Sequence, residues 1–176
     1  ENQAVQLQEA GIGEDDRVIV QLPNVVELVV TYYALSKLGA IVSPVPVQYG
    51  SHELHLVATT LNAAAIISLG RFQNRSLAEE AGRAIPEVTL LSFGSDLHID
   101  TADSGKLCRR AEENANRIVS ICWTSGTTGT PKGVPRSHNM WIATARCSIE
   151  AGGYVPQDIF LNPFPLVNMA ALGGFL

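Results

Sequence analysis

The sequence has few cysteines and histidines, and their spacing excludes the commonest disulfide and metal frameworks. Its 176 residues include four histidines and three cysteines, which are Cys108, Cys122 and Cys147. The cysteine number is odd, the spacings are wide and no CxxC pair occurs. We therefore expect neither a disulfide framework nor a metal site built from these residues. Free, scattered thiols favour a reducing compartment, so a cytoplasmic location is predicted.

Charge is also scarce, and no basic stripe runs along the chain. Charged residues make up 16% of the sequence and the net charge is −5, so nucleic acid is not expected as a partner. The first ten residues are polar and do not resemble a signal peptide. The most apolar stretch, 159–176, is interrupted by two prolines and two asparagines, whereas a membrane-spanning helix needs about 20 mostly apolar residues. No transmembrane segment is predicted. Hydrophobic residues nevertheless reach 46%, enough for a packed core.

The first half of the chain alternates short apolar runs with helical patterns. Strands are expected at 17–22, 40–45, 63–69 and 88–93, and helices at 2–10, 25–38, 51–61 and 75–84. Strands that alternate with helices predict parallel βαβ units and an α/β fold. Asn24, followed three residues later by Glu27, predicts the N-cap of the second helix.

The second half of the chain begins with a polar stretch, 94–117, which predicts a surface loop or a short charged helix around 109–116. A seam between subdomains would fall there. Beyond it we expect strands at 118–123 and 159–162, and helices at 139–151 and from near residue 168. The chain starts inside a helical pattern and ends in an apolar Gly-Gly-Phe-Leu run, so a fragment of one domain is predicted.

A run rich in glycine and threonine follows directly after the strand predicted at 118–123. It reads Thr124-Ser125-Gly126-Thr127-Thr128-Gly129-Thr130-Pro131-Lys132-Gly133. Glycines allow backbone N–H groups to converge on an anion, hydroxyls add adjustable donors, and lysine adds a positive charge. Open α/β sheets bind ligands where strands end. The run therefore predicts a polyphosphate-binding loop, although a surface loop has the same composition.

The run differs from the P-loop of nucleoside triphosphatases, G-x-x-x-x-G-K-[ST], at two positions. Counted from Gly126, the second glycine would fall at 131 and the hydroxyl at 133, which hold Pro131 and Gly133. Proline has no N–H to donate to phosphate, and glycine has no hydroxyl for magnesium. A kinase or motor-type ATPase is therefore disfavoured.

The segment Thr124–Val134 resembles the signature loop of the adenylate-forming superfamily. That superfamily includes acyl-CoA synthetases, luciferases and the adenylation domains of peptide synthetases. Residues 13–24, 37–42 and 53–54 are similar to its early strands and helices, and residues 164–168 resemble its acyl-pocket segment. The likeness covers nearly the whole chain. It implies part of the α/β N-terminal AMP-binding domain of an AMP-forming acyl-CoA synthetase, spanning 1–176, with the C-terminal domain absent.

The resemblance implies a reaction with ATP, Mg²⁺ and coenzyme A. A small carboxylic acid attacks the α-phosphorus of ATP, pyrophosphate leaves, and a thiol then takes the acyl group from the adenylate. The family's loop holds the β- and γ-phosphates, and Lys132 would be catalytic by offsetting charge on the departing pyrophosphate. The implied ATP-binding residues are Thr124, Ser125, Gly126, Thr127, Thr128, Gly129 and Lys132.

Asn168 stands where many acyl-CoA synthetases carry a histidine that faces the acyl substrate. A substrate-binding role is therefore implied, but asparagine cannot titrate near neutral pH. The alternative, that Asn168 caps the last helix, does not exclude this role. Near the loop, Cys122 is interpreted as a small buried hydrophobe, and Trp123 and Trp141 are expected to pack beneath and behind it.

Motifs for adenine, ribose and the C-terminal lysine are not found, so the chain is not expected to turn over alone. Two other functions remain open. One is an adenylation module that loads a carrier protein, and the other is a non-catalytic nucleotide-binding domain.

Overall fold

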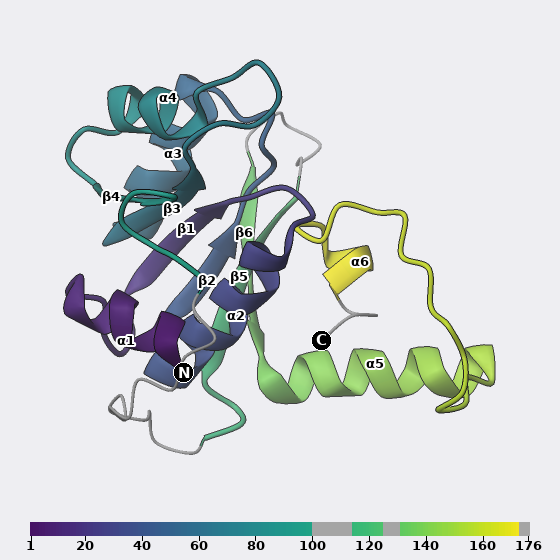
Figure 1. Ribbon diagram of the computed structural model, residues 1–176. Helices are drawn as coiled ribbons and strands as arrows, with labels where there is room; N and C mark the ends of the chain where they lie inside the picture. The colour runs from purple at the N-terminus through teal and green to yellow at the C-terminus, as the bar shows by residue number, and fades with distance from the viewer. Residues whose placement is uncertain (100–113, 125–130, 173–176) are drawn as a thin grey trace.

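The computed structural model describes residues 1–99, 114–124 and 131–172, which form a six-stranded sheet with helices packed on both faces (Figure 1). The strand order is β4-β3-β1-β2-β5-β6. Neighbouring strands from β4 to β5 are parallel, and β6 is antiparallel to β5. The predicted α/β fold is confirmed. The strands are β1 (Arg17–Gln21), β2 (Ile41–Pro44), β3 (Ala65–Leu69), β4 (Thr89–Phe93), β5 (Ile118–Thr124) and β6 (Lys132–Ser137).

The helices agree with the predicted ranges to within a few residues. They are α1 (Asn2–Glu9), α2 (Val26–Leu38), α3 (Ser51–Leu61), α4 (Leu77–Ala84), α5 (His138–Gly152) and the short α6 (Met169–Leu172). Gly39 ends α2 in the left-handed conformation, with φ of 74°, which glycine adopts without strain. None of the helices in the described part of the chain combines the length and hydropathy needed to cross a bilayer.

Two hydrophobic clusters, one on each face of the sheet, explain why the middle of β1, from Val18 to Val20, is apolar at every position. Val18 and Val20 pack with α1 and α2, whereas Ile19 packs with α3 and α4 on the opposite face. Successive side chains of a strand point to opposite faces, so the middle of a central parallel strand that is covered on both sides reads as a continuous apolar run.

The order of the strands creates a switch point at β1. The chain runs from β1 through α2 to β2, and then returns through α3 to β3 on the other side of β1. The segment after β1 therefore leads to one face of the sheet, while the segments after β2 and β3 lead to the other. Open α/β sheets bind ligands in the crevice that forms where neighbouring connections diverge.

One predicted strand is not formed, and one strand that is formed was not predicted. Residues 159–162 form no strand: Ile159 is 99% exposed and Leu161 is 84% exposed, without a sheet partner. A short apolar run forms a strand only when it can pair with an available edge of a sheet. The sequence pattern does not show whether such an edge exists. Conversely, β6 was not predicted, because Gly133 and Pro135 are poor strand formers. Both are tolerated there because β6 lies at the edge of the sheet.

The predicted N-cap of α2 was also wrong. Val25 is the N-cap of α2 and makes no side-chain cap. The Asn24 side chain instead bonds to the backbone of residues 164 and 166, distant in sequence. The spacing identified Asn24 as a side chain that can accept a hydrogen bond from a backbone N–H group. The N–H group that it binds belongs to Leu166 and not to α2.

The polar stretch 94–117 is described only at its two ends, so a seam between subdomains stays a prediction. At the second end, Arg117 bonds to Glu14 (2.7 Å), Asp15 (3.0 Å) and the Gly39 carbonyl (2.9 Å). These contacts join the start of β5 to the connections that lead into β1 and β2. Farther along the chain, α5 extends away from the sheet, and its one buried side chain is Trp141 (Figure 1).

Candidate nucleotide-binding site

The glycine- and threonine-rich run connects β5 and β6 of an antiparallel hairpin. Thr124 at the end of β5 pairs with Lys132 at the start of β6. This pair brings two predicted site residues together at the carboxyl edge of the sheet, and Lys132 is exposed there. Ser125, Gly126, Thr127, Thr128 and Gly129 lie outside the described residues, so their role in binding phosphate stays a prediction.

Alternation along the hairpin sorts its side chains onto two faces. Cys122 pairs with Val134 and lies on the same face as Thr124 and Lys132. Burial raises the pKa of the Cys122 thiol to about 11, so this cysteine remains a neutral thiol. This is the small buried hydrophobe that the sequence predicted.

The opposite face of the hairpin carries Trp123, whose indole Nε1 donates a hydrogen bond to Ser43 Oγ at 2.8 Å. Trp141 lies on the other side of β5, where it is buried and donates to Ser120 Oγ at 2.9 Å. Both tryptophans therefore brace β5, each through a serine of the sheet, and their packing against the loop stays a prediction because residues 125–130 lie outside the described part of the chain.

A cleft of about 460 Å³ opens at the switch point. Its lining comes from the connections after β1, β2 and β3 and from the segment before α6, and most of it is apolar. The residues are Leu22, Pro23, Asn24, Pro46, Val47, Gln48, Phe72, Gln73, Arg75, Pro163, Pro165 and Val167. An apolar pocket with a few polar groups at the carboxyl edge of such a sheet is a typical small-molecule site.

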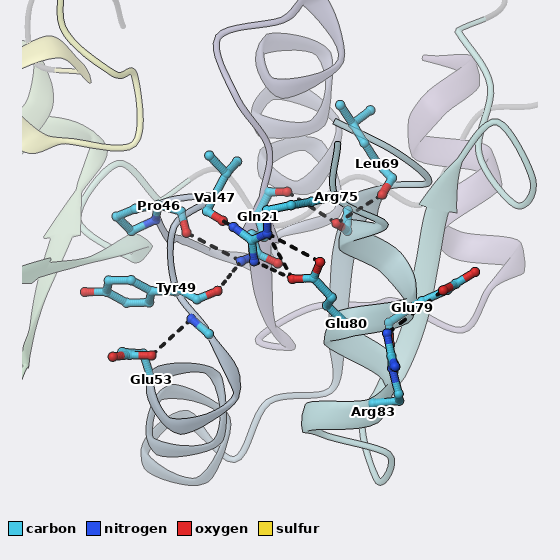
Figure 2. A network of polar contacts seen from close by, with 12 residues as sticks. Gln21, Pro46, Val47, Tyr49, Glu53, Leu69, Arg75, Glu79, Glu80 and Arg83 are labelled. Atoms are coloured by element: carbon cyan, nitrogen blue, oxygen red, sulfur yellow. Dashed lines mark hydrogen bonds and ion pairs between the residues drawn. The ribbon is translucent and has the colours of Figure 1, made fainter. Parts of the chain in front are cut away.

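The connection after β2, which forms one wall of this cleft, is held from beneath by Gln21 (Figure 2). Gln21 is 1% exposed, and its Nε2 donates to the carbonyls of Tyr49 (3.1 Å) and Pro46 (3.5 Å). A buried polar side chain costs free energy unless it is hydrogen-bonded, so this one stabilises the wall only through these bonds.

Arg75 holds the same wall from the side of β3. Its Nη1 donates to the Val47 carbonyl at 2.6 Å, and its Nε donates to Glu80 Oε2 at 3.0 Å. Figure 2 shows the guanidinium between that carbonyl and the carboxylate. The hydrogen bond from Arg75 lowers the pKa of Glu80. Sequence reasoning missed both Gln21 and Arg75; a lone glutamine in an apolar strand was the available signal.

Glu53 fixes the far end of the same connection. Its Oε2 accepts a hydrogen bond from the Gly50 N–H at 3.0 Å, where α3 begins. Backbone hydrogen bonds to the carboxylate lower the pKa of Glu53. This is one half of a capping box, the other half being absent because glycine has no side chain.

The segment predicted to line an acyl pocket does contribute to the cleft, through Pro165 and Val167. Asn168 is exposed and is not among the lining residues. Its N–H donates to the Pro165 carbonyl at 2.9 Å, and its own carbonyl accepts from the Ala171 N–H at 3.1 Å as α6 begins. Its backbone thus takes part in the turn, while a contact with substrate stays a prediction.

No group of three or more His, Cys, Asp or Glu side chains capable of holding a metal ion occurs within residues 1–99, 114–124 and 131–172.

A mostly parallel sheet with a cleft at its switch point, and a hairpin that presents Thr124 and Lys132 at the same edge, defines the class of α/β ligand-binding proteins. The family model described as AMP-binding enzyme matches residues 1–176. The chain belongs to this family, within the adenylate-forming superfamily predicted from its loop.

Curated relatives are similar in sequence over most of this chain. The chain is 31% identical to 2-hydroxy-7-methoxy-5-methyl-1-naphthoate–CoA ligase of Streptomyces carzinostaticus, over 93% of this chain and 33% of the relative. It is 29% identical to enterobactin synthase component E of Escherichia coli, over 98% of this chain and 34% of the relative. The chain thus spans about a third of the length of the curated relatives it matches.

Among solved structures, the chain is similar to o-succinylbenzoate coenzyme A synthetase of Bacillus subtilis in complex with ATP and magnesium ion. The TM-score is 0.78 at 20% identity, over 97% of this chain and 34% of that one. At this identity the likeness supports the fold.

Proposed function

We propose that the protein containing this chain activates a small carboxylic acid with ATP, releases pyrophosphate, and transfers the acyl group to the thiol of coenzyme A. The observation that carries the proposal is the pairing of Thr124 with Lys132 across the hairpin at the carboxyl edge of the sheet. This pairing sets a hydroxyl and an ammonium group at the two ends of a loop whose sequence is typical of adenylate-forming enzymes.

The donors at this hairpin suit a polyphosphate. The Thr124 hydroxyl can donate to a phosphate oxygen, and the Lys132 ammonium offers three N–H donors and a positive charge. In the proposed reaction a carboxylate oxygen bonds to the α-phosphorus while the bond to the bridging oxygen breaks. The electron pair leaves with pyrophosphate, whose growing charge Lys132 stabilises. Ser125, Gly126, Thr127, Thr128 and Gly129 are proposed to complete the phosphate contacts.

Magnesium is proposed to accompany the triphosphate, since this ion is usually bound through substrate phosphates with one or two carboxylates. The apolar cleft beside the hairpin edge is proposed to receive the carbon skeleton of the acid, with Pro165 and Val167 in its wall. Asn168 would contact the substrate from the next position. We place the protein in the cytoplasm on the basis of its scattered free thiols.

The proposal is tested by ATP–pyrophosphate exchange with the complete gene product and a panel of aromatic and aliphatic acids. Lys132→Ala should lower the exchange rate about 100- to 1,000-fold, the usual effect of removing one preorganised donor. Lys37→Ala is the matched control, because Lys37 forms a surface ion pair with Glu1. Exchange that is undiminished in Lys132→Ala would remove the assigned role, and release of ADP instead of AMP would contradict the reaction.

The acceptor is tested separately, because an adenylation module could deliver the acyl group to a carrier-protein thiol instead. Coenzyme A should yield a thioester with the preferred acid, detected by mass spectrometry. Exchange without this thioester would favour the carrier protein, and no exchange with any acid would favour a non-catalytic nucleotide-binding domain.

A further inference from the structure

The base of the β5–β6 hairpin is joined to β2 by Trp123. The indole Nε1 donates to Ser43 Oγ at 2.8 Å, and Ser43 is fully buried in β2. The Trp123 ring also packs against the second hydrophobic cluster, which contains Ile19 and Val45. By contrast, the backbone of β2 pairs with that of β5 at one register position, Val42 with Ser120. The indole bond therefore ties the two strands closer to the loop than that pairing does.

The residue opposite Trp123 is Gly133, on the edge strand β6. A β-carbon at position 133 would lie 2.9 Å from Ile121 Cγ2 and 3.5 Å from the Trp123 ring. The first distance is shorter than two carbon atoms tolerate, so a larger residue would force the Ile121 side chain or the strands to shift. An aromatic ring covering a glycine on an edge strand is a known way to fix the register of a hairpin. Here it fixes the pair directly before the loop.

Thr124 and Lys132 are the next pair along the hairpin, one residue beyond Trp123 and Gly133. Because side chains alternate, they project from the face opposite the indole. A ring held on one face thus sets the height and tilt of both residues on the other. Without the bond to Ser43, the indole could rotate and the Thr124–Lys132 pair would no longer be fixed relative to β2.

We propose that Trp123 is a positioning residue for the phosphate loop, acting through a clamp formed by Ser43, Trp123 and Gly133. This inference rests on the proposed function, since it assigns the clamp the task of presenting Thr124 and Lys132 to the triphosphate. Ser43 supplies the fixed acceptor in β2, Trp123 transmits its position to β5, and Gly133 lets β6 lie against the ring. None of the three needs to touch the nucleotide.

The kinetic test compares Ser43→Ala, Trp123→Phe and the double variant in the complete gene product. Each single variant should lower kcat/KM for ATP in pyrophosphate exchange about tenfold, the equivalent of one hydrogen bond. Both changes remove the same bond, so the double variant should be little worse than either single one. The KM for the acid should stay within about twofold. Ser92→Ala, which truncates another buried serine on the distant strand β4, is the matched control.

A second arm tests the glycine. Gly133→Ala should lower kcat/KM for ATP, and Ile121→Ala in the same protein should restore part of it, since Ile121 Cγ2 is the atom in the way. Fully additive effects of Ser43→Ala and Trp123→Phe would overturn the clamp. So would single variants that exchange pyrophosphate at the parental rate.

A readout independent of catalysis separates the clamp from the proposed function. Ser43→Ala should speed amide hydrogen exchange in residues 118–124 and 132–137 several-fold, whereas Ser92→Ala should leave these residues unchanged. Unchanged protection in Ser43→Ala would overturn the clamp even in an active enzyme. If the parent protein exchanges no pyrophosphate but Ser43→Ala loosens the hairpin, the proposed reaction fails while the structural clamp stands.

Discussion

The side-chain amide of Asn24 bonds to the backbone on both sides of Pro165, through two contacts with residues more than 100 positions away. Asn24 Oδ1 accepts from the Leu166 N–H at 2.8 Å, and Asn24 Nδ2 donates to the Phe164 carbonyl at 3.0 Å. Pro165, between the two bonded residues, and Asn24 itself both line the cleft. One side chain therefore sets where the segment after α5 closes over the switch point.

Replacement of Asn24 by alanine should release this segment. Each lost bond contributes about 1 kcal/mol, so amide exchange of Leu166 should rise about fivefold or more. Asn24→Asp is the informative companion, because it keeps the acceptor for Leu166 and loses the donor to Phe164. Hydrogen exchange with mass spectrometry on 160–168 gives the measurement. Equal protection in parent and Asn24→Ala proteins would show that other contacts hold the segment.

Replacement of Gln21 by leucine should destabilise the domain by about 1–3 kcal/mol, since the Tyr49 carbonyl loses its buried donor. The urea midpoint for unfolding of this domain reports the change. Gln48→Leu, at an exposed position in the same connection, is the control and should move the midpoint little. A midpoint unaltered by Gln21→Leu would mean that water replaces the amide at this wall.

The cap at Glu53 predicts a pH dependence in the acid range. The folded-state pKa of Glu53 is lowered from its ordinary value of 4.5, mainly by backbone hydrogen bonds. Its contribution to stability is therefore complete above the unfolded pKa and is lost as pH falls through the lower folded pKa. NMR titration of the Glu53 carboxyl should show a midpoint below 4.5.

Glu53→Gln tests the same cap through unfolding. Because the amide does not titrate, the variant should lose part of the decline in stability between about pH 5 and pH 3. Solvent screens the partly exposed Glu53 carboxylate, so the measured quantity is the slope of unfolding free energy against pH. A parental slope in Glu53→Gln would assign the decline to other carboxylates.

The two described cysteines should differ sharply in reactivity. Cys122 is buried with a pKa of about 11, whereas Cys147 is exposed. Since the thiolate is the reactive form, iodoacetamide at pH 8 should label Cys147 in the native protein well before Cys122. Peptide mass spectrometry follows each site, and urea should abolish the difference. Rapid labelling of Cys122 in the native protein would contradict its burial.

Most of the fold could be predicted because its signals are local. The βαβ alternation appears in apolar runs such as 17–22, and a helix such as 25–38 has a largely apolar pattern and a glycine, Gly39, that ends it. The failures were tertiary in origin. Strand β6, with Gly133 and Pro135, exists because β5 offers it an edge, whereas 159–162 has the composition of a strand and finds no edge.

Part of the candidate site could also be named from the sequence. The ends of the loop, Thr124 and Lys132, were identified from residue types that suit phosphate, and the structure pairs them across one hairpin. The cleft wall was not identified, because Gln21 and Arg75 act on carbonyls 25 or more residues away and leave no local pattern.

The sequence by itself determined the α/β class and the family, and it located the glycine- and threonine-rich run proposed to bind phosphate, because the hydrophobic period and the residue types of this run are properties of neighbouring residues. Only the tertiary structure decided that β1 is flanked by β2 and β3, so that a cleft opens at its end. It likewise decided that Asn24 bonds to the distant segment 164–166 and that Trp123 donates a hydrogen bond to Ser43. Such contacts depend on which strands become neighbours. The strand order follows from the burial of both faces of the sheet, which depends on many segments of the chain at once.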